Sequence, residues 1–238
     1  MSSRNAAFHD GALAGVLLSP LKLLFSLALG LAALLLCAWI LDWTFVFKVW
    51  PQGIERLREL LAHDLEHGVG LAARQQGAGA GAITAPANAL YSFVFEATGV
   101  HDMGTQFANG AALSIPDTVM RRSYVSHRES IEAAMVGTQL LGVRAAIVAR
   151  FAPLLLLLYA VGAADGFTQR AIRRACGGRE SAGLYHRAKY LQVALLGLGG
   201  VCLLLWPGAV WWDLVVPVGA VLLGGLASVQ WAYYKKHM

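Results

Sequence analysis

Two histidines and a glutamate at helical spacing make His63-Asp64-Leu65-Glu66-His67 the segment most suggestive of metal chemistry. It fits the H-x-x-E-H pattern, in which histidines four residues apart on one helix reach a zinc ion and the glutamate acts as general base. A third ligand is also required, and Glu96, His101 and Asp102 show no diagnostic spacing. We therefore predict an exposed polar helix face at 63–67. A membrane metallopeptidase using His63, Glu66 and His67 is the alternative.

A serine, a histidine and an acid also occur within one short stretch, as Ser181, His186 and Asp165. Nothing around Ser181 resembles the nucleophile elbow of a hydrolase triad, and the stretch is strongly basic. The glycine–alanine run 77–82 lacks the Lys-Ser/Thr that holds phosphate and magnesium in a Walker loop. The sequence therefore predicts no catalytic residue, no metal and no cofactor, and the protein is not expected to be an enzyme.

The composition is that of an integral membrane protein, with 57% hydrophobic and only 14% charged residues. Soluble domains carry about 25% charged residues, so a water-soluble globular enzyme is excluded. Four apolar stretches approach the roughly 20 residues that a membrane-spanning helix needs. The predicted spans are 23–41, 144–164, 191–206 and 214–232. The second includes Arg150, whose side chain is expected to extend toward the membrane surface.

Lysine and arginine gather in three segments, namely the N-terminus 1–22, the loop 165–190 and the C-terminus 233–238. With four spans, all three lie on one side of the membrane, and the positive-inside rule makes that side the cytoplasm. We expect a bacterial inner membrane with both termini cytoplasmic. The long segment 42–143 and the short turn 207–213 are then periplasmic.

The long segment 42–143 is predicted to be helical, so the fold class is all-α: a polytopic membrane protein with four transmembrane helices and a helical periplasmic insertion. Within it, 51–74 has the period of an amphipathic helix, whose apolar stripe consists of Ile54, Leu57, Leu61, Leu65 and Gly68. A flexible connector is favoured over 75–86, with close packing of small side chains as the alternative. Short helices are expected at 87–98 and 104–113. Pro116 and Asp117 break the pattern, and a helix over 126–144 is expected to continue into the second span.

Small residues recur every fourth position in the last span, at Ala220, Gly224 and Ser228. Association of helices in lipid depends on close backbone approach at such residues. This strip is therefore predicted to pack against another helix, within the subunit or across a homo-oligomer.

The loop after the second span carries an unusual combination of residues. Asp165-Gly166 is followed by Gln169-Arg170, Arg173-Arg174, Gly178-Arg179-Glu180-Ser181, Tyr185-His186 and Ala188-Lys189. This combination resembles the integrating conjugative element membrane protein family, which is found on bacterial mobile elements and conjugative plasmids. The resemblance is specific over about 165–190 and covers the rest of the chain in layout.

The resemblance implies a component of the DNA-transfer machinery associated with the coupling protein, the ATPase that serves a type IV secretion channel. It implies no enzymatic activity. The expected function is a non-enzymatic accessory subunit of conjugative transfer, with a permease-type subunit as a further alternative to the metallopeptidase. Its expected partners are the coupling ATPase, other secretion subunits and anionic lipid. Indirect DNA contact and a homo-oligomer are also compatible with this interpretation.

The candidate site residues share the basic loop and have an architectural or a partner-binding role. They are Asp165, Gly166, Arg170, Arg173, Arg174, Arg179, Glu180, Ser181, Tyr185 and His186. We expect Arg179 and Glu180 to form a polar knot with Asp165 and His186 that fixes the turn between two spans.

Overall fold

The computed structural model describes residues 3–76, 79–108, 115–176 and 182–234. These residues form helices joined by short turns, without a strand, which confirms the all-α prediction. The helices are α1 (Ser3–Thr44), η1 (Phe45–Val49), α2 (Ile54–Gln76), α3 (Gly81–Tyr91), η2 (Ser92–Glu96), α4 (Val100–Ala108), α5 (Ile115–Ser126), α6 (Arg128–Arg150), α7 (Ala152–Ala175), α8 (Ala182–Leu204) and α9 (Trp212–Ala232); η1 and η2 are single π-helical turns. Within the described ranges, four helical stretches are long and apolar enough to cross a membrane: Lys22–Val49, Arg128–Ala175, Gly183–Leu204 and Trp212–Ala232.

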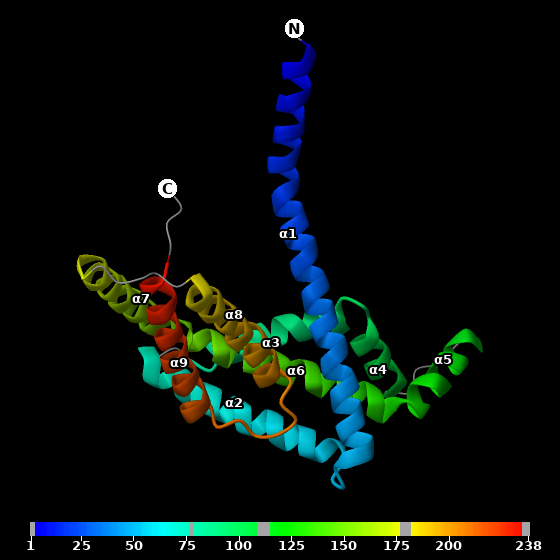
Figure 1. The fold of residues 1–238 in the computed structure, drawn as a ribbon. Coiled ribbons are helices and arrows are strands. Elements are labelled where there is room, and N and C mark those ends of the chain that lie inside the picture. Colours follow the sequence, from blue (N-terminus) through cyan, green and yellow to red (C-terminus); the bar gives the residue numbers. More distant parts are fainter. Residues whose placement is uncertain (1–2, 77–78, 109–114, 177–181, 235–238) are drawn as a thin grey trace.

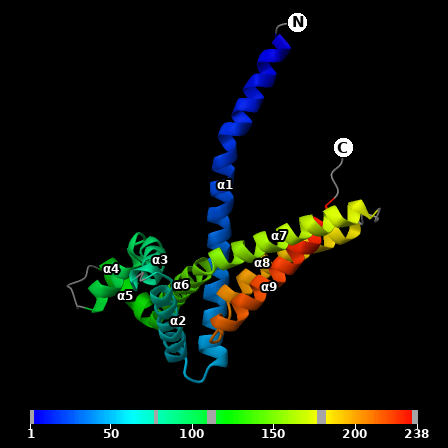
Figure 2. The same ribbon diagram turned by 90° about the vertical axis from the view of Figure 1, so that its left-hand side faces the viewer.

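The molecule has two parts that meet at α6 (Figures 1 and 2). Helices α2, α3 and α6 form a layer, while α1 and the bundle α7–α9 extend from one side of it. The N-terminal end of α1 and the C-terminal end of α9 both point away from this layer (Figure 1). One apolar cluster joins the two parts, since Ile83 and Ile147 of the layer are buried in the same core as Trp212 and Val216 of α9.

Helix α2 is amphipathic, and its apolar side covers α6. Leu57 and Leu60 are fully or almost fully buried, and Gly68 is buried against Ile83 and Ile147. The periodicity of the sequence predicted this orientation. One residue differs, because Asp64 lies on the buried side rather than on the polar face where the pattern was expected to place it.

The expected connector over 75–86 is mostly helix. Helix α2 continues to Gln76, α3 begins at Gly81, and only a short gap separates them. Close packing of small side chains, the alternative to a connector, explains this helix. A Cβ atom on Gly142 of α6 would lie 2.6 Å from the Cα atom of Ala87, so α3 and α6 approach as closely as their backbones allow. Beyond α3, the chain continues as η2 and α4, and α5 starts at Ile115, which places Pro116 in a first helical turn, where proline is tolerated.

The segment expected to enter the second span without interruption is divided at Phe151. Helix α6 ends there, with the Phe151 amide bonded to the Val148 carbonyl, and α7 begins at Ala152 with Pro153 in its first turn. Pro153 has no backbone N–H to bond the carbonyl of Ala149, and its ring would clash with that carbonyl in a continuous helix, which explains the break. Residues 144–150 therefore belong to the layer and 152–164 to the bundle. Arg150 lies at the joint, where its carbonyl accepts a hydrogen bond of 3.4 Å from Gln75 Nε2.

Helices α7 and α9 run parallel and in direct backbone contact. A Cβ atom added to Gly162 would lie 2.0 Å from the Gly224 carbonyl oxygen, and one added to Gly166 would lie 2.4 Å from the Ser228 carbonyl oxygen. Ala220 of α9, one turn before Gly224, is completely buried. The strip of small residues in α9 thus faces two glycines four residues apart in α7, an arrangement typical of close helix pairs in membranes.

Candidate functional site

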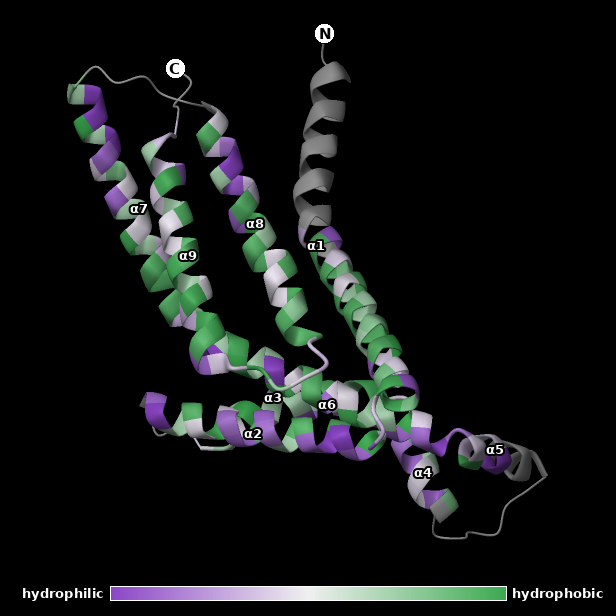
Figure 3. Ribbon diagram, turned by 60° about the horizontal axis from the view of Figure 1, so that its bottom comes forward, coloured by the Kyte–Doolittle hydropathy of each residue, from purple (hydrophilic) through white to green (hydrophobic). Residues whose placement is uncertain are grey.

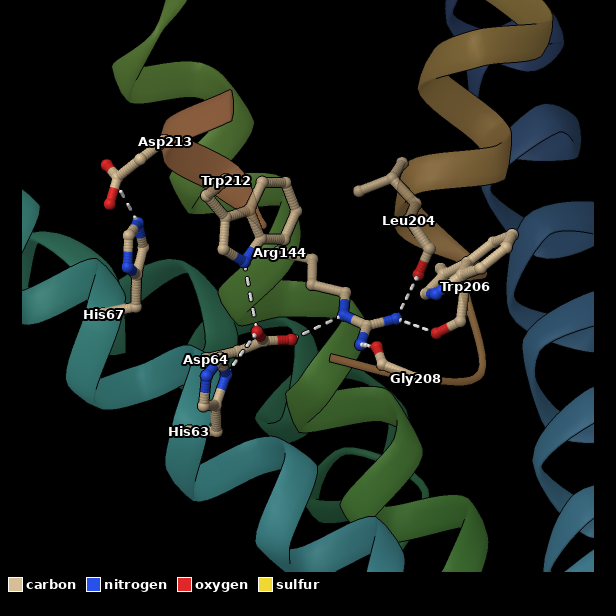
Figure 4. A network of polar contacts seen from close by, with 9 residues as sticks. All are labelled: His63, Asp64, His67, Arg144, Leu204, Trp206, Gly208, Trp212 and Asp213. Carbon is tan, nitrogen blue, oxygen red and sulfur yellow. Dashed lines mark hydrogen bonds and ion pairs between the residues drawn. The ribbon is translucent and has the colours of Figure 1, made fainter. Parts of the chain in front are cut away.

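A buried ion pair lies where the layer meets the bundle (Figure 4). Arg144 Nε of α6 donates to Asp64 Oδ2 of α2 at 2.7 Å, and the two side chains are 1% and 0% exposed. The second carboxylate oxygen, Oδ1, accepts a hydrogen bond of 3.1 Å from the indole nitrogen of buried Trp212 at the start of α9. Three helices distant in sequence are therefore joined through one carboxylate.

The other nitrogens of Arg144 bind the backbone of the α8–α9 loop. Nη1 donates to the carbonyls of Leu204, at 3.4 Å, and of Trp206, while Nη2 donates to the Gly208 carbonyl at 2.9 Å. The last carbonyls of a helix lack intrahelical partners, so Arg144 serves as a cap for α8. A buried charge is tolerated where its donors are satisfied, and each guanidinium nitrogen of Arg144 has an acceptor.

The sequence analysis missed this site, although part of the signal was present. Asp64 lies three residues after Leu61 and four before Gly68, so it shares the apolar stripe of its helix. A lone acid on a buried stripe requires a cation. Its partner is 80 residues away in the chain, and the sequence placed Arg144 only at the start of a span.

The histidines of the H-x-x-E-H pattern lie beside this ion pair. His63 is half exposed, with Nδ1 3.3 Å from Asp64 Oδ1, and His67 Nε2 is 3.8 Å from Asp213 Oδ1. Glu66 is exposed on the other side of the helix. Within the described residues, no three His, Cys, Asp or Glu side chains are grouped so that they could hold a metal ion.

A second polar group occupies the opposite end of the bundle and contains the family-like residues. Asp165 accepts hydrogen bonds from Ser228 Oγ at 2.5 Å and from Gln169 Nε2 at 2.7 Å. The next residue, Gly166, lies against the backbone of α9, so the Asp165 carboxylate is located at the contact between α7 and α9.

Further along α7, two arginines stack on tyrosines that follow α9. The guanidinium carbon of Arg173 lies 3.9 Å from the centre of the Tyr233 ring, and that of Arg170 lies 5.3 Å from the Tyr234 ring. Arg173 Nη1 also donates to the Ala232 carbonyl at 3.2 Å. Such cation–π contacts contribute about 0.5–1 kcal/mol each at exposed sites and more where they are desolvated.

Helix α8 joins the same cluster through its first turns. The Tyr185 ring is 5.2 Å from His186 and 5.7 Å from Tyr234, measured between ring centres. We refer to Arg170, Arg173, Tyr185, Tyr233 and Tyr234 as the arginine–tyrosine cluster.

The structure thus brings Asp165, Gly166, Arg170, Arg173, Tyr185 and His186 to one end of the bundle, with Arg174 exposed beside them. Arg179, Glu180 and Ser181 lie outside the described residues, as does their part of the expected polar knot.

Over the part of the chain that the structure describes, fold and site together define an all-helical protein with four helical stretches long and apolar enough to span a membrane. The chain belongs to the DtrJ-like family: the model described as IncC plasmid conjugative DNA transfer protein DtrJ-like matches residues 49–235, including both polar sites. This match confirms the expected relation to conjugative elements and implies a role in conjugative DNA transfer. No curated protein matches the chain significantly. No solved structure does so either.

Proposed function

We propose that the chain is a non-enzymatic inner-membrane accessory subunit of conjugative DNA transfer that binds the coupling ATPase of a type IV secretion system. The observation that carries the proposal is the family match over 49–235. The arginine–tyrosine cluster adds a candidate contact surface, because it holds two arginines of α7 against tyrosines at the start of α8 and after the end of α9.

The distribution of polar residues supports an orientation with this cluster in the cytoplasm. Figure 3 shows hydrophobic middle sections in α1, α8 and α9 and hydrophilic residues at the far end of α7 and at the start of α8. The basic residues at these two ends are Arg170, Arg173, Arg174, Arg187 and Lys189, and Lys22 lies where the apolar span of α1 begins. By the positive-inside rule these ends face the cytoplasm, and the layer of α2, α3 and α6 then lies at the periplasmic surface.

Thiol labelling tests this orientation. In a background with Cys37→Ala and Cys202→Ala, exposed Cys176 is the remaining native thiol. We expect an impermeant maleimide to label Gln52→Cys, an exposed position in the turn before α2, in cells with a permeable outer membrane. Cys176 should react only after lysis. The reverse pattern would show that the orientation is wrong.

Co-purification tests the partner. Deleting the gene should lower transfer of the element while growth is unchanged, and the coupling ATPase should co-purify with the tagged chain. Replacing Arg173 and Arg174 with glutamine should reduce the ATPase recovered per amount of chain, whereas Arg56→Gln on α2 should not. Equal recovery with all variants would contradict a contact at the arginine–tyrosine cluster.

A further inference from the structure

Arg150 lies at the joint between α6 and α7, and its charged group has no partner in the described ranges. The backbone carbonyl accepts from Gln75 Nε2 at 3.4 Å, but no hydrogen bond of the guanidinium and no ion pair with an acid is formed there. The side chain is half-buried, and none of its nitrogen atoms is both buried and unbonded. Arginine remains charged in proteins. A positive charge that is accessible from outside the protein is therefore present at this joint.

The side chain of Arg150 lines a groove of about 530 Å³. This volume lies within the range of roughly 300–1,000 Å³ that is typical of small-ligand sites. The groove opens where α2 ends, α3 begins and α6 passes into α7, and the small residues Ala82, Ala146 and Ala149 leave it free of bulky side chains. Gln75 is the other polar residue of its lining, and no acid of the described residues lines it. The groove thus has room for an anionic group beside the arginine.

The groove passes into an apolar surface along α7. Pro153 and Leu154 form its side toward the bundle. Leu157 and Val161, three and seven residues after Leu154, lie on the same face of α7 and are 60% and 57% exposed. This part of α7 belongs to a stretch that is apolar enough to span a membrane. A ligand with a phosphate at one end and hydrocarbon chains at the other fits this sequence of polar and apolar surface, whereas a free anion would use only the polar end.

We propose that the groove binds the phosphate of a phospholipid, with the Arg150 guanidinium donating to the phosphate oxygens and the acyl chains lying along Leu157 and Val161. The fork of the guanidinium matches two oxygens of one phosphate. A charged residue at the edge of a membrane-spanning helix is costly unless it reaches a partner or the head groups, and the phosphate supplies that partner. The periplasmic leaflet as the source of the lipid rests on the proposed membrane orientation. Binding there would stabilise the joint between the layer and the bundle.

Lipid titration of the full-length protein, purified without lipid in neutral detergent, tests the site. Phosphatidylglycerol should raise the melting temperature and appear as bound lipid in native mass spectra. Diacylglycerol, which lacks the phosphate, and inorganic phosphate, which lacks the chains, should do neither. Arg150→Gln should weaken phosphatidylglycerol binding about tenfold, as expected for loss of one charge-assisted pair of hydrogen bonds. Arg150→Lys, which keeps the charge but loses the fork, should bind with intermediate strength.

Two further variants separate the groove from surface charge and from folding. Ala149→Leu keeps every charge but fills part of the groove, so it should also weaken binding. Arg74→Gln removes an exposed arginine of α2 that does not line the groove, and it should bind the lipid as the parent does. Without lipid, Arg150→Gln should melt at the temperature of the parent, because no described residue bonds to the guanidinium.

Three results would overturn the proposal. The first is phosphatidylglycerol binding that neither Arg150→Gln nor Ala149→Leu weakens. The second is an equal loss of binding in Arg74→Gln, which would reduce the effect to general surface charge. The third is inorganic phosphate that stabilises the parent as much as the lipid does, which would assign the groove to a free anion. A reversed thiol-labelling pattern would reject the periplasmic leaflet as the source. Recovery of the coupling ATPase is a separate measurement, so its failure would reject the proposed partner and leave the lipid site standing.

Discussion

Arg144 combines two roles, since it neutralises Asp64 and caps the backbone at the end of α8. Side chains that pair a buried charge are costly to remove singly, because the remaining partner stays buried without compensation. The layer and the bundle are joined at this point by one guanidinium, one carboxylate and one indole. The ion pair is therefore expected to hold the two parts of the molecule together.

Replacing Arg144 should destabilise the protein strongly. We expect Arg144→Met to lower the unfolding free energy by about 3–5 kcal/mol, because Asp64 would remain buried and unpaired. The double variant Asp64→Leu/Arg144→Met should recover part of this loss, since it leaves no unpaired charge. Urea unfolding in detergent micelles measures both, with Arg150→Met at the helix joint as control. Losses that add up fully in the double variant would contradict the coupling.

For single residues, the sequence predicted which positions are buried better than it predicted which residues contact each other. The apolar stripe of α2 was visible in its spacing, and Asp64 could have been placed on it. Nothing local to 144 indicated that its arginine reaches the carbonyls of Leu204 and Gly208, because that contact depends on how three helices cross. The expected grouping of Asp165, Arg170 and Tyr185 came from family resemblance, and their spatial relation required the structure.

At the scale of the elements, close backbone contact organises the bundle. Helix α9 lies between α7 and α8, and its approach to α7 depends on glycines that present no side chain. Apolar side chains gain little from association in lipid, so tight packing is a main source of stability for such a pair.

The α7–α9 contact should not tolerate a methyl group. We expect Gly162→Ala to separate the helices and to lower the melting temperature, because the new Cβ atom would lie 2.0 Å from the Gly224 carbonyl oxygen. Gly197→Ala on α8 is a matched control, since no atom lies within 4 Å of the Cβ position there. That change should be neutral or stabilising, as alanine favours helix over glycine by about 1 kcal/mol. Equal melting temperatures for the two variants would count against the contact.

Helix types were predictable from periodicity, but helix boundaries were less so. A glycine–alanine run such as 77–82 suits a flexible connector, yet α3 begins within it because Ile83 and Ala87 find buried positions on α6. The break at Phe151 was missed for the opposite reason. The hydropathy continues across it, and only Pro153 marks the change of direction.

Across the whole molecule, the helices differ in how extensively they pack against other helices. Helix α6 is covered by α1, α2 and α3, whereas α4 and α5 meet mainly through Phe107 and Tyr124. Segments with few contacts open locally at low free energy, while central helices open only with global unfolding. The same molecule therefore contains a firmly held layer and two weakly held helices, α4 at 100–108 and α5 at 115–126.

Limited trypsin digestion of spheroplasts should reveal both this difference and the orientation. Cleavage requires the chain to unfold locally around the cut, so the first cut should fall at exposed Arg121 or Arg122 of α5 rather than at exposed Arg58 of α2. Arg58 is held by Glu55 and Glu132, and its helix is packed on α6. Arginines at 170–187 should be cut only after the membrane is permeabilised, which provides the internal control. An early cut in α2 would contradict the stability of the layer, and an early cut at 170–187 in intact spheroplasts would contradict the proposed orientation.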